Sequence, residues 1–164
     1  MNNLLNKILP FLKQIGLQYH LEPLNENTFL PGLRLRKGEL VIDADKLLYP
    51  GDVLHEAGHL ACVPDQVRRG MSGDLEDIDV HRSGEMMAIA WSYAAAVFLQ
   101  INPEIVFHEK GYKGGGKDIL HNFENGYYIG LPMLQWSGMC YDQTTAEKMG
   151  LPCFPHMIRW VCEK

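Results

Sequence analysis

Three residues near the middle of the chain combine the side chains and the spacing of a metal-dependent hydrolase. His55 and His59 stand at positions i and i+4, so on an α-helix they share one face, with Cβ atoms about 5–6 Å apart. Two imidazoles at that spacing can each place a ring nitrogen about 2.0–2.1 Å from one zinc ion. Glu56 can reach a water molecule on that ion without binding the ion itself. The motif His-Glu-x-x-His therefore predicts two metal ligands and a general base.

The residues around this motif are apolar, and they are Val53, Leu54, Ala57, Leu60 and Ala61. This pattern predicts a mostly buried helix, from which the histidines project out of a hydrophobic wall. A buried histidine or carboxylate destabilises a fold unless it is paired, hydrogen-bonded or bound to metal. The alternative is an ordinary core helix with two satisfied histidines and a surface glutamate, but the spacing favours a metal site.

A catalytic zinc ion needs a third protein ligand beside its water molecule. Glu85 is the preferred candidate because it opens a second apolar helix, where an unpaired carboxylate would be destabilising. The amino end of that helix would also favour the ionised carboxylate, so Glu85 could instead be a solvated residue stabilised by the helix dipole alone. Asp65, Asp79 and His81 are alternative third ligands that the sequence leaves open.

Asp65 carries a competing interpretation. The spacing His55-x-x-x-His59-x-x-x-x-x-Asp65 resembles the ligand spacing of one branch of the metzincin peptidases, and Ser137–Tyr141 resembles their methionine turn. However, those enzymes have a glycine where this chain has Cys62, and Pro64 falls in the wrong place. We therefore keep Glu85 as the predicted third ligand.

The elements ahead of the motif can be predicted from apolar periodicity and turn signals. Residues Met1–Tyr19 form an amphipathic pattern that predicts a helix, interrupted or kinked at Pro10. Leu33–Arg36 and Glu39–Asp43 predict the two strands of a β-hairpin, with its turn at Lys37-Gly38.

Two buried helices should follow this hairpin. Asp52 is the predicted N-cap of the motif helix, which should end near Val63 because Pro64 follows. Ser83 is the predicted cap of a longer helix over Gly84–Leu99, which is apolar nearly all round and should therefore be central to the core.

The last third of the chain is less regular. The predicted elements are a strand or short helix at Ile105–His108, helical segments at Ile119–Phe123 and Thr144–Met149, and a short docking helix at Pro155–Cys162. Gly111–Lys117 matches Gly-x-x-x-x-Gly-Lys, the start of a phosphate-binding loop, but Asp118 stands where magnesium binding requires Ser or Thr. No parallel α/β alternation follows, so we predict an exposed loop, as at the rim or lid of a cleft.

Composition limits the function classes. The chain has 164 residues, of which 46% are hydrophobic and 21% charged, and we expect one globular domain over residues 1–164. Net charge −5 and the absence of a Lys/Arg run argue against nucleic-acid binding. The longest uncharged run, Met86–Pro103, is too short and too rich in Ala, Ser and Tyr to span a membrane.

Cysteine usage and the amino terminus suggest a compartment. Cys62, Cys140, Cys153 and Cys162 form no Cys-x-x-Cys pair, and Met1–Tyr19 lacks the continuous apolar run of a signal peptide. We therefore expect a reduced, cytoplasmic protein, in which Cys62 serves as a packing residue.

The hairpin, His55-Glu56-x-x-His59 and Glu85-x-x-Ala88 together resemble the compact gluzincins, and are most similar to the ImmA/IrrE-like bacterial metallopeptidases. The resemblance covers Leu33–Asn102. It implies an α+β, zincin-like fold, with a small antiparallel sheet packed on the motif helix and on a second buried helix.

The same resemblance implies a mechanism for hydrolysing a peptide or protein substrate. One zinc ion per chain would bind His55, His59 and Glu85, and Glu56 would take a proton from water and pass it to the leaving amine. The strand Glu39–Asp43 would be the edge strand along which an extended substrate lies. An oxyanion stabiliser is also needed, and the candidates left open are His121, His108, Arg82 and Tyr128.

Two further functions remain open at this stage. A zincin-like domain could serve as a non-catalytic metal-binding sensor or protein-interaction module, because a fold does not guarantee an activity. It could also hydrolyse a non-peptide substrate with the same water chemistry. The presence of Glu56 favours a hydrolase, whereas the oligomeric state is not predicted.

Overall fold

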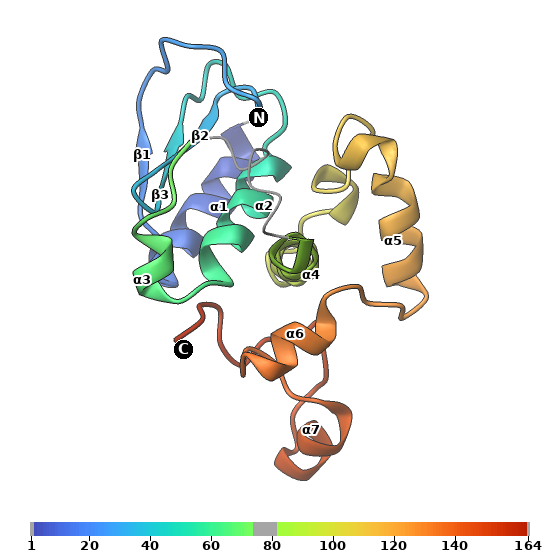
Figure 1. Cartoon of the computed structure of the whole chain (residues 1–164). Coiled ribbons are helices and arrows are strands. Elements are labelled where there is room, and N and C mark those ends of the chain that lie inside the picture. Colours follow the sequence, from blue (N-terminus) through green and yellow to red (C-terminus); the bar gives the residue numbers. More distant parts are fainter. Residues whose placement is uncertain (1, 74–81, 164) are drawn as a thin grey trace.

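The computed structural model describes residues 2–73 and 82–163 and confirms a mixed α+β architecture. Figure 1 shows the sheet on one side, α1 and α2 next to it, α4 at the centre and α5 on the far side. The α-helices of the described residues are α1 (Asn2–Gln14), α2 (Gly51–Ala61), α3 (Asp65–Arg68), α4 (Arg82–Phe98), α5 (Gly116–Glu124), α6 (Leu131–Trp136) and α7 (Gln143–Met149). The strands are β1 (Tyr19–Leu21), β2 (Leu33–Arg36) and β3 (Glu39–Ile42), and the 3₁₀ helices are η3 (Pro103–Ile105) and η4 (Tyr112–Gly114).

The predicted hairpin is confirmed. β2 pairs with β3 in antiparallel register, with Leu33 opposite Ile42. The connecting residues, Lys37 and Gly38, have φ of 52° and 80°. Two successive positive φ values are the mark of a tight hairpin turn whose twist matches that of the strands.

The predicted sheet type and edge strand are wrong. β1, of which only Tyr19 falls within the predicted first helix, pairs in parallel with β3, so that Tyr19 lies opposite Leu40. The strand order is β1-β3-β2, which makes the sheet mixed and β3 its central strand. A long loop separates β1 from the hairpin, so no local sequence signal predicts that β1 pairs with β3. β2 is the edge strand on the hairpin side.

The motif helix α2 starts two residues earlier than predicted. Pro50, with φ of −59°, occupies the N-cap position, and the chain is already helical at Gly51. Asp52 is therefore not the cap. It lies in the first turn with a buried side chain, and its carboxylate pairs with His108. Cys62 is the C-cap, close to the predicted end of the helix.

The central feature of the core is the crossing of α2 and α4. α4 presents small residues to its neighbours, because Ala88, Ala90 and Ala94 are all fully buried. At Gly58 of α2, an added Cβ would lie 2.9 Å from the carbonyl oxygen of Ala88 and 3.1 Å from its Cα. The two backbones therefore approach more closely than any side chain at position 58 would allow.

The carboxy-terminal segment docks onto this core, but not as a helix. The predicted helix at Pro155–Cys162 is wrong, because its backbone donors bond to other segments: Ile158 N–H donates to Met139 O (3.0 Å) and Cys162 N–H to Ala61 O (2.7 Å). The predicted docking is confirmed, since Trp160 packs on Trp91 with ring centroids 5.6 Å apart. The indole of Trp91 also donates to Trp160 O at 2.9 Å.

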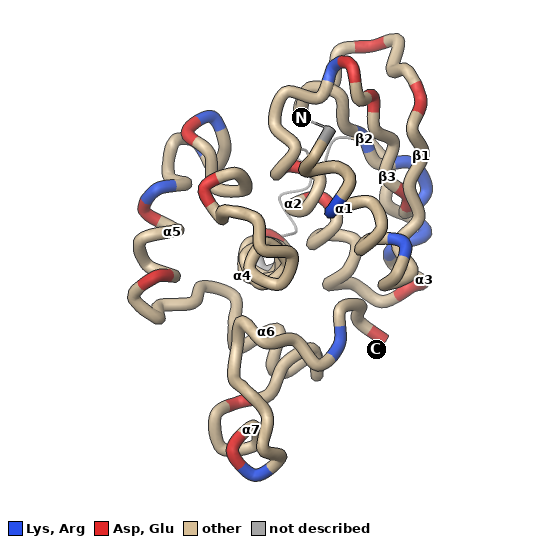
Figure 2. The backbone as a smooth tube through the Cα atoms, turned by 180° about the vertical axis from the view of Figure 1, so that it is seen from behind, with Lys and Arg blue, Asp and Glu red and all other residues tan. Residues whose placement is uncertain are grey.

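Basic residues gather beside the sheet and α3, whereas Asp and Glu are spread along the chain (Figure 2). Several of these arginines pair with carboxylates: Arg34 with Glu26, Arg36 with Glu22 and Arg69 with Asp65. Much of their charge is therefore locally neutralised. Within residues 2–73 and 82–163, no helix is long and apolar enough to cross a bilayer.

Gly58→Ala should destabilise the protein, although alanine favours a helix over glycine by about 1 kcal/mol. The new methyl group meets backbone of α4, and overpacking of this kind costs about 1–3 kcal/mol. Thermal unfolding should show a lower midpoint for Gly58→Ala than for the wild type. Gly70→Ala is the matched control, because its Cβ would meet only Val67 O at 3.4 Å. Equal midpoints for both variants would contradict the close crossing.

The buried carboxylate of Asp43 ties the end of β3 to two loops. It accepts hydrogen bonds from the backbone N–H of Leu24 (2.9 Å), Asp45 (3.1 Å) and Lys46 (3.3 Å). The bond from Leu24, with those from Asp45 and Lys46, lowers the pKa of Asp43 below its ordinary value. The ionised form is therefore the one that stabilises the fold.

Asp43→Asn should lower the stability of the protein at pH 7, because the amide accepts fewer hydrogen bonds and carries no charge. Since the folded pKa is lowered, this contribution is fully present above about pH 4 and is lost as the pH falls through the folded pKa. Urea unfolding at pH 7 and at pH 3 should therefore show a larger difference between variant and wild type at pH 7. A difference that does not change with pH would exclude this role, and Asp45→Asn is the neighbouring control.

Candidate metal centre

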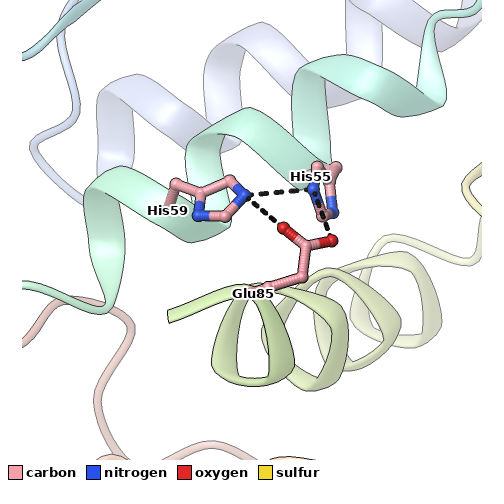
Figure 3. A group of neighbouring side chains, drawn as sticks. All are labelled: His55, His59 and Glu85. Carbon is pink, nitrogen blue, oxygen red and sulfur yellow. Dashed lines mark hydrogen bonds and ion pairs between the residues drawn. The ribbon is translucent and has the colours of Figure 1, made fainter. Parts of the chain in front are cut away.

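The two histidines of the motif lie one turn apart on α2 and turn their Nε2 atoms toward the same point (Figure 3). These two atoms are 3.1 Å apart. The rings are nearly perpendicular, with centroids 4.7 Å apart and an interplanar angle of 89°. The lone pairs of both Nε2 atoms can therefore converge on one ion.

Glu85 reaches the same point from the first turn of α4. Its Oε1 lies 3.4 Å from His55 Nε2, and its Oε2 lies 3.1 Å from His59 Nε2. Burial alone would raise the pKa of Glu85, but the hydrogen bonds to His55 and His59 outweigh it and hold the pKa well below its usual range. The carboxylate is therefore ionised, as a metal ligand must be.

The spacing of these donor atoms fits a small transition-metal ion. Ligands at about 2.0–2.1 Å from a tetrahedral ion lie about 3.3–3.4 Å from one another. The separations here are 3.1, 3.1 and 3.4 Å. His55, His59 and Glu85 could thus hold a metal ion, and a set of two imidazoles and one carboxylate suits zinc and several of its neighbours.

The alternative third ligands fare differently. Asp65 is exposed on α3, where its Oδ2 lies 2.6 Å from Nη2 of Arg69, and it is not part of the cluster. The spacing that resembled the metzincins is therefore not matched by a shared site. Asp79 and His81 lie outside the described residues.

Glu56 is positioned beside the cluster without belonging to it. It follows His55 on α2, only 8% of its surface is exposed, and it lines the same cleft as the three candidate ligands. A carboxylate in this position could exchange a proton with a molecule bound in the cleft.

The cleft has a volume of about 1080 Å³. Its apolar lining includes Phe29, Leu48, Val63, Val67, Met71 and Ile119, and its polar lining includes Asp52, His108, Lys110 and Lys113 beside the residues of the cluster. Leu33, Arg34 and Leu35 of β2 also line it. The strand that borders the cleft is therefore β2 rather than the predicted β3.

His108 is the one predicted oxyanion stabiliser that lines the cleft among the side chains described. Its Nε2 lies 2.8 Å from Asp52 Oδ1, its ring stacks on Tyr49, and its Nδ1 is buried without a hydrogen-bond partner in residues 2–73 and 82–163. Burial raises the pKa of Asp52, and the bond to His108 opposes that rise. Since both ring nitrogens face the protein, His108 supports the wall of the cleft and is not poised to donate to a substrate.

The other oxyanion candidates are not in the cleft or are not described. His121 is exposed on α5, and Tyr128 packs against Phe123 with ring centroids 5.5 Å apart. Neither residue lines the cleft. The side chain of Arg82 lies outside the described part of the structure.

Tyr112 contacts the cluster, although no sequence motif singles it out. Its hydroxyl lies 3.0 Å from Nδ1 of His55, the ring nitrogen that faces away from Glu85. Burial raises the pKa of Tyr112 well above its ordinary value, and the nearby Glu85 and Asp52 add to the rise. In the sequence, Tyr112 stands out only as part of the glycine-rich run Gly111–Lys117, and that run resembles a phosphate-binding loop rather than a metal site.

That glycine-rich run forms the rim of the cleft, as predicted, through Gly111, Tyr112 and Lys113. It follows a 3₁₀ helix and a turn rather than the strand that a phosphate-binding loop requires. Lys117, at the position of the phosphate-binding lysine, pairs instead with Glu109 at 2.6 Å. These observations argue against a nucleotide site.

The sequence matches no known protein family, and no curated protein and no solved structure is similar to it. The resemblance to the gluzincins therefore rests on the hairpin, His55-Glu56-x-x-His59 and Glu85 alone.

Zinc affinity should separate the competing ligand sets. Loss of a residue that hydrogen-bonds to a metal ligand typically weakens zinc binding by about 10–100-fold. Glu85→Ala removes one of the three ligands themselves, so it should weaken zinc binding by more than this. Asp65→Ala should keep the wild-type affinity, because Asp65 pairs with Arg69 outside the cluster. Both variants can be titrated against a chromophoric chelator, with metal content measured by mass spectrometry. Loss of zinc in Asp65→Ala alone would contradict the assignment.

Proposed function

We propose that this protein is a zinc-dependent metallopeptidase. The observation that carries the proposal is the convergence of His55, His59 and Glu85 on one point of a cleft that Glu56 also lines. Three ligands leave a fourth position on a tetrahedral ion, as catalytic zinc sites do, whereas structural sites are closed by four protein ligands.

The proposed roles follow from the donor set. His55, His59 and Glu85 would hold the zinc ion, which would polarise a substrate carbonyl and lower the pKa of a water molecule. Glu56 would accept the proton of that water and deliver it to the leaving amine. Its near-complete burial keeps competing bulk water away from this transfer.

The proposed substrate is a peptide or protein segment. A cleft of about 1080 Å³ has room for several residues, and its apolar lining can hold aliphatic or aromatic side chains. Phe29, Leu48 and Val67 are half-exposed or more at this cleft, so their apolar surface is available to a ligand. An extended substrate would run beside β2, the strand that borders the cleft.

Glu56→Gln should abolish most of the hydrolysis and leave zinc binding intact. The amide keeps the size of the side chain but cannot accept the proton, and general-base catalysis is worth about 10²–10⁴-fold in rate. The measurement is cleavage of a mixed peptide library by the zinc-loaded protein, followed by mass spectrometry. Glu124→Gln, an exposed substitution on α5, is the control and should cleave like the wild type.

Two results would overturn the proposal in different ways. Full activity in Glu56→Gln would mean that another group takes the proton. A wild-type protein that binds zinc but cleaves no peptide in the library would favour the metal-binding sensor or interaction module instead.

A further inference from the structure

Two residues near the cluster have features that packing does not explain. Ser92 is 0% exposed in α4, where its neighbours along the buried face are Ala88, Trp91 and Ala95. Tyr112 has φ of 54°, a left-handed conformation that bulky residues rarely adopt. Buried polar groups and unusual backbone both call for a compensating interaction. Tyr112 contacts His55, and Ser92 lies near the phenol of Tyr112.

The backbone around Tyr112 directs its ring into the cluster. Tyr112, Lys113 and Gly114 have successive positive φ values of 54°, 54° and 86°. The ring of Tyr112 then packs on Phe107, with centroids 5.3 Å apart, and stands edge-on to His55 at the same centroid distance. The glycine-rich rim therefore places the aromatic side chain of Tyr112 beside His55, on the side of the ring that faces away from Glu85.

The direction of the hydrogen bonds follows from the role of His55. Its Nε2 faces Glu85 and His59, so Nε2 must be free of a proton when it binds metal, and the ring proton must then be on Nδ1. Nδ1–H would donate to the oxygen of Tyr112, 3.0 Å away. The phenol proton then needs an acceptor of its own.

Ser92 is placed to be that acceptor. Its side chain lies within the electrostatic reach of the Tyr112 phenol, and its own hydroxyl donates to the carbonyl oxygen of Ile89 at 3.0 Å. The lone pairs of Ser92 Oγ thus remain for the phenol. With the phenol proton on Ser92 Oγ, every donor from His55 to Ser92 would have one acceptor, which is what a fully satisfied buried network requires.

We propose that Tyr112 is a positioning residue, which holds His55 in the tautomer that leaves Nε2 available to metal through the chain His55 Nδ1–H to Tyr112, Tyr112 O–H to Ser92, and Ser92 O–H to Ile89. The proposal rests on the metal site proposed above. This series of hydrogen bonds ends on α4, the helix that also carries Glu85. α4 would therefore provide one ligand, Glu85, and would also hold a second ligand, His55, in place.

Tyr112→Phe tests this role with little change in shape. The ring would keep its contact with Phe107, but His55 Nδ1 would lose its partner. Zinc affinity, measured by competition with a chromophoric chelator, should fall by about 10–100-fold, as is typical when the hydrogen-bond partner of a ligating histidine is removed. Ser92→Ala should weaken zinc binding less, because Tyr112 would still accept from His55. Tyr93→Phe is the matched control and should bind zinc like the wild type.

A spectroscopic measurement separates positioning from general loosening of the fold. In ¹⁵N NMR spectra of the zinc-loaded wild type, His55 should show a proton on Nδ1 that exchanges slowly with solvent. In Tyr112→Phe this proton should exchange faster, while thermal unfolding and the backbone spectrum stay close to those of Tyr93→Phe.

The outcomes distinguish this inference from the proposed function. Wild-type zinc affinity and an unchanged Nδ1 proton in Tyr112→Phe would overturn the positioning role, whatever the peptidase assay shows. An affinity loss in Tyr112→Phe together with a wild type that cleaves no peptide would support the positioning role and reject the peptidase. A wild type that binds no zinc would overturn both.

Discussion

The site depends on how closely α2 and α4 approach at Gly58 and Ala88. The absence of a side chain at position 58 lets the backbone of α4 lie against α2, with Ala88 O only 2.9 Å from the point that a Cβ would occupy. Glu85 lies about one turn before Ala88 on α4, and Gly58 lies between the two histidines in the sequence. The close crossing therefore brings a carboxylate of one helix between the imidazoles of the other, and a wider spacing would separate the three donors.

At the crossing of α2 and α4, polar side chains lie inside an otherwise apolar layer. Several of them lie on one face of α2. His55 and Glu56 lie three and four residues after Asp52, and His59 lies four and three residues after these two, so all four share one helical face. Asp52 is paired with His108, and His55 is bonded to Tyr112. The Nε2 atoms of His55 and His59 lie against each other and against the carboxylate of Glu85. A metal ion at this point would satisfy all three donors at once.

Local patterns in the sequence predicted the elements that carry the site, but not what lies beside them. The apolar runs around His55 and Ala90 predicted α2 and α4, and Lys37-Gly38 predicted the hairpin turn, because these signals depend on neighbours in the chain. The parallel pairing of β1 with β3 and the irregular docking of the tail depend on distant segments. Tyr112 was missed for the same reason, since a loop residue shows its partner only when the chain is folded.

The residues that hydrogen-bond to the motif helix come from a part of the chain that lies outside the motif. His108 and Tyr112 both follow Asn102, where the resemblance to the gluzincins ends, and both bond to the motif helix from outside it. The His-Glu-x-x-His helix and the glutamate helix thus supply the donor atoms, whereas the segment between η3 and α5 bonds to the motif helix and lines the cleft. A metallopeptidase of the kind proposed above must hold its catalytic geometry to within a fraction of an ångström, so this segment would matter to the proposed chemistry as much as the ligands do.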